Sequence, residues 1–261
     1  MLNIHFEEVK AILDEKYAFY NQPVFIETDP VCIPHRFSTK EDIEISGFLT
    51  ATLAWGQRKT IIHNSIRLME FMSNSPFQFV MDAGKFEMDQ LSRFVHRTFN
   101  GDDLLFLLDS FREIYLHHGG MEAVVRSGIK PGSLDISGGL IQLRKILLET
   151  PHLKRSEKHI ANILANSSAK RLNMFLRWMI RKDDAGVDFG IWDISPSLLL
   201  CPLDVHSGRS ARRLGLLERN ADDFKSVIEL THALRSFDPH DPVKYDFALF
   251  GMGIGENPRL I

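Results

Sequence analysis

Apolar residues recur along most of this chain at intervals of three and four, the spacing that places them on one face of an α-helix. The clearest stripe lies in residues 170–181, where Leu172, Phe175, Leu176 and Met179 share a face. Comparable stripes occur in residues 4–20, 38–53, 61–72, 104–115, 137–149, 203–217 and 224–234. Strand signals are scarce, and the best candidate is residues 23–26. The spacing therefore predicts an all-α fold.

The joints between these helices are short, and the chain contains no internal repeat and no low-complexity linker. Its 261 residues, 44% of them apolar, suffice for one large domain or for two closely packed ones. We therefore expect one compact helical unit over residues 1–261, made of two interlocked lobes. One lobe covers residues 50–170 approximately, and the other combines residues 1–49 with 171–261.

The chain has two cysteines, Cys32 and Cys201, which are too few for a disulfide framework or for a four-cysteine zinc or iron–sulfur site. Its first ten residues carry acids, unlike a signal peptide. No stretch approaches the roughly 18 apolar residues that span a membrane. We expect a cytoplasmic protein with no cofactor, no metal, no iron–sulfur cluster and no membrane partner.

Charge is unevenly placed along the chain, although the formal net charge is only −3. Residues 154–219 hold 12 Lys and Arg against 7 Asp and Glu, whereas the sequence on either side is acidic. A basic segment in an acidic chain is typical of a surface that binds nucleic acid or phosphate. An ordinary solvated helix face would have the same composition.

Lys170 follows Ser167-Ser-Ala169 and begins the helix with the clearest apolar stripe. A cation in a first helical turn is disfavoured by the helix dipole, which makes a neutral, nucleophilic amine more accessible. The same turn offers backbone N–H groups to a phosphate. The alternative is a surface lysine that points into water.

Asp204 stands directly before an arginine-rich helix, in the sequence Asp204-Val-His206. An aspartate at that position caps the helix and stays ionised, and a fixed carboxylate can also stabilise positive charge that develops at a sugar carbon. Asp-x-His could suggest a metal pair, but no further ligands follow at a telling spacing.

A polar interruption, Trp55-Gly-Gln57-Arg58-Lys, separates two of the predicted helices. Its simplest interpretation is a structural corner. The alternative is that Gln57, flanked by two cations, enters a nucleic-acid groove.

Three segments resemble DNA glycosylases of the endonuclease III superfamily. Ala169-Lys-Arg-Leu-Asn173 resembles the second half of their helix–hairpin–helix, Leu203-Asp-Val-His-Ser-Gly-Arg209 their aspartate segment, and Leu53-Ala-Trp-Gly-Gln57 the segment whose glutamine enters DNA. The layout is most similar to the archaeal 8-oxoguanine DNA glycosylase branch, and the whole chain resembles an uncharacterised bacterial family of this superfamily. The resemblance implies two helical lobes with a helix–hairpin–helix-like element.

The resemblance also implies an activity, excision of a damaged base followed by strand cleavage, with Lys170 as nucleophile and Asp204 as second catalytic residue. The implied partner is double-stranded DNA with a flipped nucleotide, which would make the protein nucleoid-associated, and we expect a monomer. Contacts to DNA are expected from Gln57, Arg58, Ser168, Arg171, Arg177, His206 and Arg209. Candidate walls of the base pocket are Trp55, Phe189 and Trp192.

The chain departs from the superfamily at the hairpin, where Asn166-Ser-Ser-Ala169 replaces the usual Gly-x-Gly. Glycine freely adopts positive φ, and these residues do so at a cost. Two alternatives therefore stay open. One is a nucleic-acid-binding protein that retains the fold without catalysis, and the other is an enzyme that acts on RNA or a nucleotide.

Overall fold

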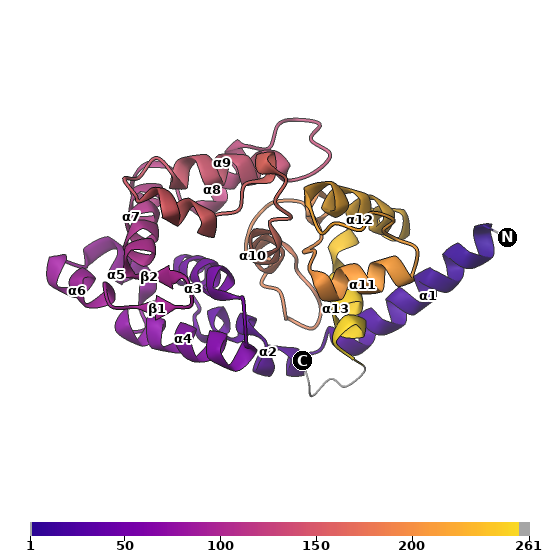
Figure 1. Cartoon of the computed structure of the whole chain (residues 1–261), viewed down its shortest axis with the longest axis horizontal. Coiled ribbons are helices and arrows are strands. Elements are labelled where there is room, and N and C mark those ends of the chain that lie inside the picture. The colour runs from indigo at the N-terminus through magenta and orange to yellow at the C-terminus, as the bar shows by residue number, and fades with distance from the viewer. Residues whose placement is uncertain (1, 256–261) are drawn as a thin grey trace. The chain divides into compact units, whose positions relative to one another are not determined.

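The computed structural model describes residues 2–255, and its regular structure is mostly helical (Figure 1). The chain divides into two compact units. The terminal unit combines the chain through residue 29 with the chain from residue 163 onward, and the central unit covers residues 30–162. Within residues 2–255, none of the helices is both long enough and apolar enough to cross a membrane.

The central unit contains seven α-helices and one short hairpin among its described residues. These elements are α3 (Lys40–Leu53), α4 (Arg58–Phe71), α5 (Pro76–Asp82), α6 (Lys85–Leu91), β1 (Val95–His96), β2 (Phe99–Asn100), α7 (Gly101–His117), α8 (Met121–Ser127) and α9 (Ser137–Leu147). The antiparallel strands pair Val95 with Asn100 and His96 with Phe99. Most of α3 is buried, which suits a helix at the centre of a unit.

The terminal unit is built from both ends of the chain. Its elements are α1 (Leu2–Tyr20), α2 (Pro23–Thr28), α10 (Lys170–Ile180), α11 (Val205–Arg213), α12 (Phe224–Phe237) and α13 (Asp246–Ile254). Helix α13 packs against both α1 and α11 (Figure 1). Glycine permits α13 to lie close to α1, because a Cβ at Gly251 would lie 2.3 Å from the Tyr20 ring.

The structure differs from the sequence-based expectations at two places. The expected lobe boundary near residue 50 lies at residue 30, because α3 packs against α4, α5 and the turns at 30–36. Residues 23–26, the best strand candidate, instead begin α2. Pro23 occupies the first helical position, where a missing N–H costs nothing.

Candidate active site

Lys170 and Asp204 form an ion pair at the surface of the terminal unit. Lys170 is the first residue of α10, Asp204 immediately precedes α11, and Lys170 Nζ lies 3.0 Å from Asp204 Oδ2. Their side chains are 31% and 19% exposed, so the pair is held by the protein and still reaches solvent. The structure thus brings together an amine and a carboxylate that the sequence placed in separate segments.

The local sequence fixes the Asp204 carboxylate in a reciprocal cap. Its Oδ1 accepts hydrogen bonds from the backbone N–H groups of His206 at 2.8 Å and Ser207 at 3.0 Å. The Ser207 hydroxyl in turn accepts from the Asp204 N–H at 2.9 Å. Burial raises the pKa of Asp204, but Lys170 and the two amides outweigh burial and hold that pKa below its ordinary 3.8. The carboxylate therefore stays ionised at neutral pH.

The turn before Lys170 adopts the left-handed conformation without glycine. Asn166 has φ of 63° and Ala169 has φ of 50°, a conformation that costs a non-glycine residue about 1–2 kcal/mol. The side chain of Asn173 supports the turn by donating to the Ser168 carbonyl at 3.1 Å. This strained turn sets the direction in which α10 begins and so positions Lys170.

The helix expected before this turn has a different form. Residues 154–159 and 163–165 are short 3-10 turns, and no α-helix lies between α9 and α10. Of the expected helix–hairpin–helix, the structure therefore contains the turn and the second helix, and the first helix is replaced by 3-10 turns.

Phe250 is a neighbour of the pair that the sequence reasoning missed. The Lys170 amine lies 6.0 Å from the centre of its ring, and the His206 ring lies 6.2 Å from it. The glycines of α13 are a sequence signal that this helix packs closely against another. A Cβ at Gly253 would lie 2.4 Å from the His206 carbonyl oxygen, so α13 needs a glycine there to lie against α11.

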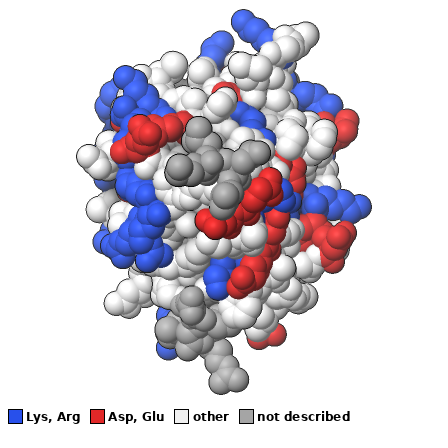
Figure 2. Space-filling view, turned by 90° about the vertical axis from the view of Figure 1, so that its right-hand side faces the viewer, with Lys and Arg blue, Asp and Glu red and all other residues white. Residues whose placement is uncertain are grey.

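The other expected contact residues of this unit are distributed around the pair. His206 and Arg209 are exposed on α11, and Ser168 and Arg171 are half-buried beside Lys170. The basic segment is less cationic on the surface than in the sequence, because Arg212 and Arg219 pair with neighbouring aspartates. Figure 2 shows the largest group of cations at the left of one face, further cations at its top and right edges, and a band of acids between them.

Arg177 is not available to DNA, so its assignment as a contact was wrong. Its side chain is 5% exposed, with Nε 3.2 Å from Asp188 and Nη1 2.5 Å from Asp246. Its guanidinium also lies 4.2 Å from the centre of the Phe247 ring. The apolar stripe of α10 marked one buried face, and these carboxylates from later in the chain allow a second face to be buried.

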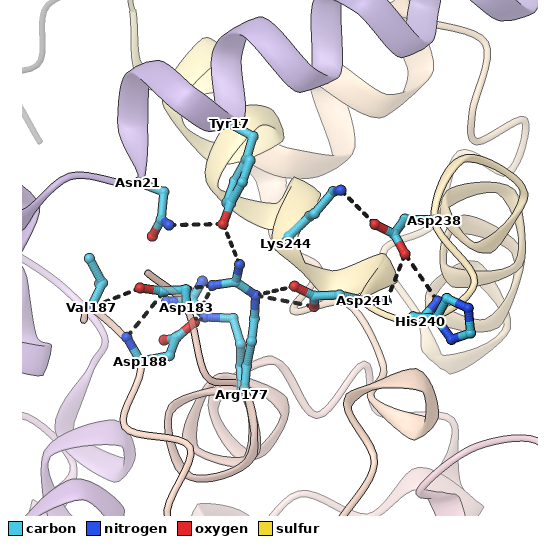
Figure 3. A network of polar contacts seen from close by, with 11 residues as sticks. Tyr17, Asn21, Arg177, Asp183, Val187, Asp188, Asp238, His240, Asp241 and Lys244 are labelled. Atoms are coloured by element: carbon cyan, nitrogen blue, oxygen red, sulfur yellow. Dashed lines mark hydrogen bonds and ion pairs between the residues drawn. The ribbon is translucent and has the colours of Figure 1, made fainter. Parts of the chain in front are cut away.

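Arg181, the residue directly after α10, belongs to a buried polar network. Figure 3 labels several members of this network, among them Tyr17, Asp183 and Asp241. Arg181 forms ion pairs with Asp183 at 2.7 Å, Asp188 at 3.0 Å and Asp241 at 2.8 Å. Its Nη2 donates to the Tyr17 hydroxyl at 2.6 Å, which ties α10 to α1. The network links α1 to the chain segments that follow α10 and α12.

Asp246 joins this network to the site electrostatically. Burial raises the pKa of Asp246 to about 6; Arg177 and Lys170 oppose that rise, and the charge on Asp204 adds to it. The folded protein holds the Asp246 proton more firmly than the unfolded chain does. The contribution of this proton to the free energy of unfolding is therefore present at low pH and is lost as pH rises through 6.

An Asp246→Asn variant is therefore expected to remove that pH dependence. Between pH 5 and 7, the wild-type free energy of unfolding should fall about 1 kcal/mol more than that of the variant. Urea unfolding at several pH values measures both slopes, and parallel profiles would contradict the assignment.

Two of the proposed pocket walls lie elsewhere. Trp192 is 3% exposed and packs against Phe175 at 5.6 Å, so it belongs to the core and its assignment was wrong. The Phe189 N–H donates to the Trp178 carbonyl. Trp178 lies eight residues after Lys170 in α10, about 12 Å along the helix axis, so Phe189 does not lie beside Lys170.

Trp55, Gln57 and Arg58 belong to the central unit. Gln57 is exposed at the N-terminus of α4, and Arg58 is half-buried as its first residue. The guanidinium of Arg97 covers the Trp55 ring at 4.6 Å. That cover contradicts the assignment of Trp55 as an open pocket wall.

Metal binding and thiol chemistry would draw on other side chains of residues 2–255. No group of three or more His, Cys, Asp and Glu side chains in this range is placed to hold a metal ion. Cys201 is fully buried, and burial raises the pKa of its thiol well above the ordinary value, so it is no candidate nucleophile.

Fold and site together define a mostly helical protein with a half-buried, solvent-accessible lysine–aspartate pair in its terminal unit. A family model described as a protein of unknown function (DUF2400) matches residues 29–255, and the chain belongs to that family. No curated protein and no solved structure is found to match the chain.

Proposed function

We propose that the protein is a DNA glycosylase with lyase activity, which acts on a flipped, damaged nucleotide of double-stranded DNA. Oxidised purines are among the candidate lesions. The observation that supports the proposal most strongly is the 3.0 Å contact between Lys170 and Asp204 at a solvent-accessible position. A lysine next to a carboxylate that is ionised at neutral pH suits attack on a carbon that becomes positively charged.

In the first step, the bond between sugar C1′ and the base breaks, and its electron pair leaves with the base. The base takes a proton from the Lys170 ammonium, which becomes a neutral amine. The Asp204 carboxylate stabilises the positive charge on C1′ and the ring oxygen. Since two backbone amides already hold this carboxylate, it needs no reorganisation to act.

In the second step, the Lys170 nitrogen bonds to C1′. The C1′–O4′ bond then breaks, O4′ keeps its electron pair and takes a proton from the nitrogen, and a protonated Schiff base remains. Asp204 accepts a proton from C2′, and the 3′ phosphate leaves with the electrons of the C3′–O bond. In this scheme Ser168, Arg171, His206 and Arg209 hold phosphates around the lesion without reading sequence.

Reductive trapping tests the proposal. The protein is incubated with abasic and oxidised duplexes in the presence of borohydride, which converts a Schiff base into a stable amine. Wild-type protein should give a covalent adduct, and Lys170→Gln should give none. Lys225→Gln is the matched control, because Lys225 is an exposed lysine in the first turn of α12.

The outcomes separate the alternatives. A folded wild-type protein that gives no adduct with any lesion excludes the lyase. If binding to duplex then persists in Lys170→Gln and falls steeply with salt, the protein is a nucleic-acid-binding protein without this catalysis. If neither occurs, a nucleotide or RNA substrate becomes the leading explanation.

A further inference from the structure

Arg97, at the tip of the β1–β2 hairpin, lies over the Trp55 ring in the central unit. Its guanidinium carbon is 4.6 Å from the centre of the Trp55 ring, although the Arg97 side chain is exposed. The approach is close enough that a Cβ at Gly56 would lie 2.4 Å from Arg97 Nη1. Among residues 2–255, the guanidinium makes no hydrogen bond or ion pair, so its donors are not engaged by another part of this range.

The backbone at Arg97 is strained. Its φ is 57°, a conformation that Gly or Asn adopts more easily than arginine. The two-residue turn between β1 and β2 therefore carries an arginine where a smaller residue would cost less. Strain of this kind indicates that the side chain is placed for a purpose beyond closing the hairpin.

Further cations adjoin the same tip. Arg155 donates to the Thr98 carbonyl at 2.8 Å and is anchored by Asp103 at 2.9 Å, with 38% of its side chain exposed. Gln57 and Lys59, close in sequence to Gly56, are exposed where α4 begins, and the first turn of α4 contains no acid. We call the group formed by Trp55, Gln57, Lys59, Arg97 and Arg155 the hairpin surface.

We propose that the hairpin surface binds the phosphodiester backbone of nucleic acid, as a contact separate from the Lys170–Asp204 pair. An arginine stacked on an aromatic ring has already lost much of its side-chain freedom, and its planar donors match two phosphate oxygens. The hairpin surface combines such an arginine with further cations and an exposed amide. The inference rests on the proposed function only in naming DNA as the partner.

Arg97→Asn is the sharpest test, because Asn removes the charge and tolerates the positive φ. Binding of an undamaged, fluorescently labelled duplex is measured by anisotropy at several salt concentrations. We expect affinity to fall about tenfold at low salt and the slope of log affinity against log salt to decrease by about 1. Lys85→Gln, which removes an exposed cation of α6 in the same unit, should change neither by more than about twofold.

A second readout uses Trp55 itself. Duplex binding should change the tryptophan fluorescence of the wild-type protein, and that change should be absent in Trp55→Phe, which keeps an aromatic platform. Equal affinity and salt slope in Arg97→Asn and Lys85→Gln would overturn the inference, as would a wild-type protein that binds no duplex at low salt. Since no lesion is involved, failed trapping with binding that depends on Arg97 rejects the lyase alone.

Discussion

Replacing Asp204 by Asn is expected to lower strand cleavage at an abasic site by a factor of about 100–1,000 while leaving the fold intact. The amide oxygen of Asn can accept the two backbone hydrogen bonds that Asp204 accepts, and Asn caps helices as well as Asp does. What disappears is the negative charge next to Lys170. The free energy of unfolding should therefore change by less than about 1 kcal/mol.

Asp238→Asn provides the matched control. Asp238 also accepts two backbone hydrogen bonds, from His240 and Asp241, and also pairs with a lysine, Lys244. The Asp238→Asn variant should cleave abasic DNA at the wild-type rate. Cleavage by Asp204→Asn within threefold of wild type, measured as single-turnover product formation, would show that the carboxylate charge is not used.

Replacing Arg177 by Leu is expected to cost about 3–5 kcal/mol of folding free energy, the largest stability effect of the changes considered. The substitution leaves the buried carboxylate of Asp246 without its guanidinium partner and removes one of the two guanidinium partners of Asp188. The loss should shrink below pH 6, because protonation removes the charge on Asp246. Urea unfolding at pH 7 and pH 5 measures both effects.

Arg213→Leu is the control for this change, since Arg213 is exposed at the end of α11 and should alter stability by less than about 0.5 kcal/mol. If Arg177→Leu were as stable as this control and instead weakened the salt dependence of DNA binding, Arg177 would be a surface contact after all.

Periodicity predicted the helices well because a helix is a local structure. The stripe at residues 170–181 is α10, and the stripe at 224–234 is α12 (Phe224–Phe237). The β1–β2 hairpin was missed, since two strands of two residues each leave no alternation to read. Residues 23–26 were misassigned because proline is compatible with both a strand edge and a first helical turn.

The candidate site likewise combines local features, which the sequence predicts, with contacts between distant segments, which it does not. Asp204 as a cap and Lys170 as the first residue of a helix are local properties, and the sequence predicted both. Phe250 beside Lys170, and Asp246 as the partner of Arg177, depend on chain segments separated by 69 or more positions. A stripe of apolar residues tells which face of α10 is buried, but it cannot tell that carboxylates elsewhere allow another face to be buried too.

The most direct measurement on the central claim is to locate the covalent bond itself. Wild-type protein is trapped with borohydride on abasic duplex, digested, and analysed by mass spectrometry to find the modified residue. We expect the sugar remnant to be attached to Lys170. An adduct on another lysine or on the N-terminal amine, or no adduct from folded protein, would contradict it.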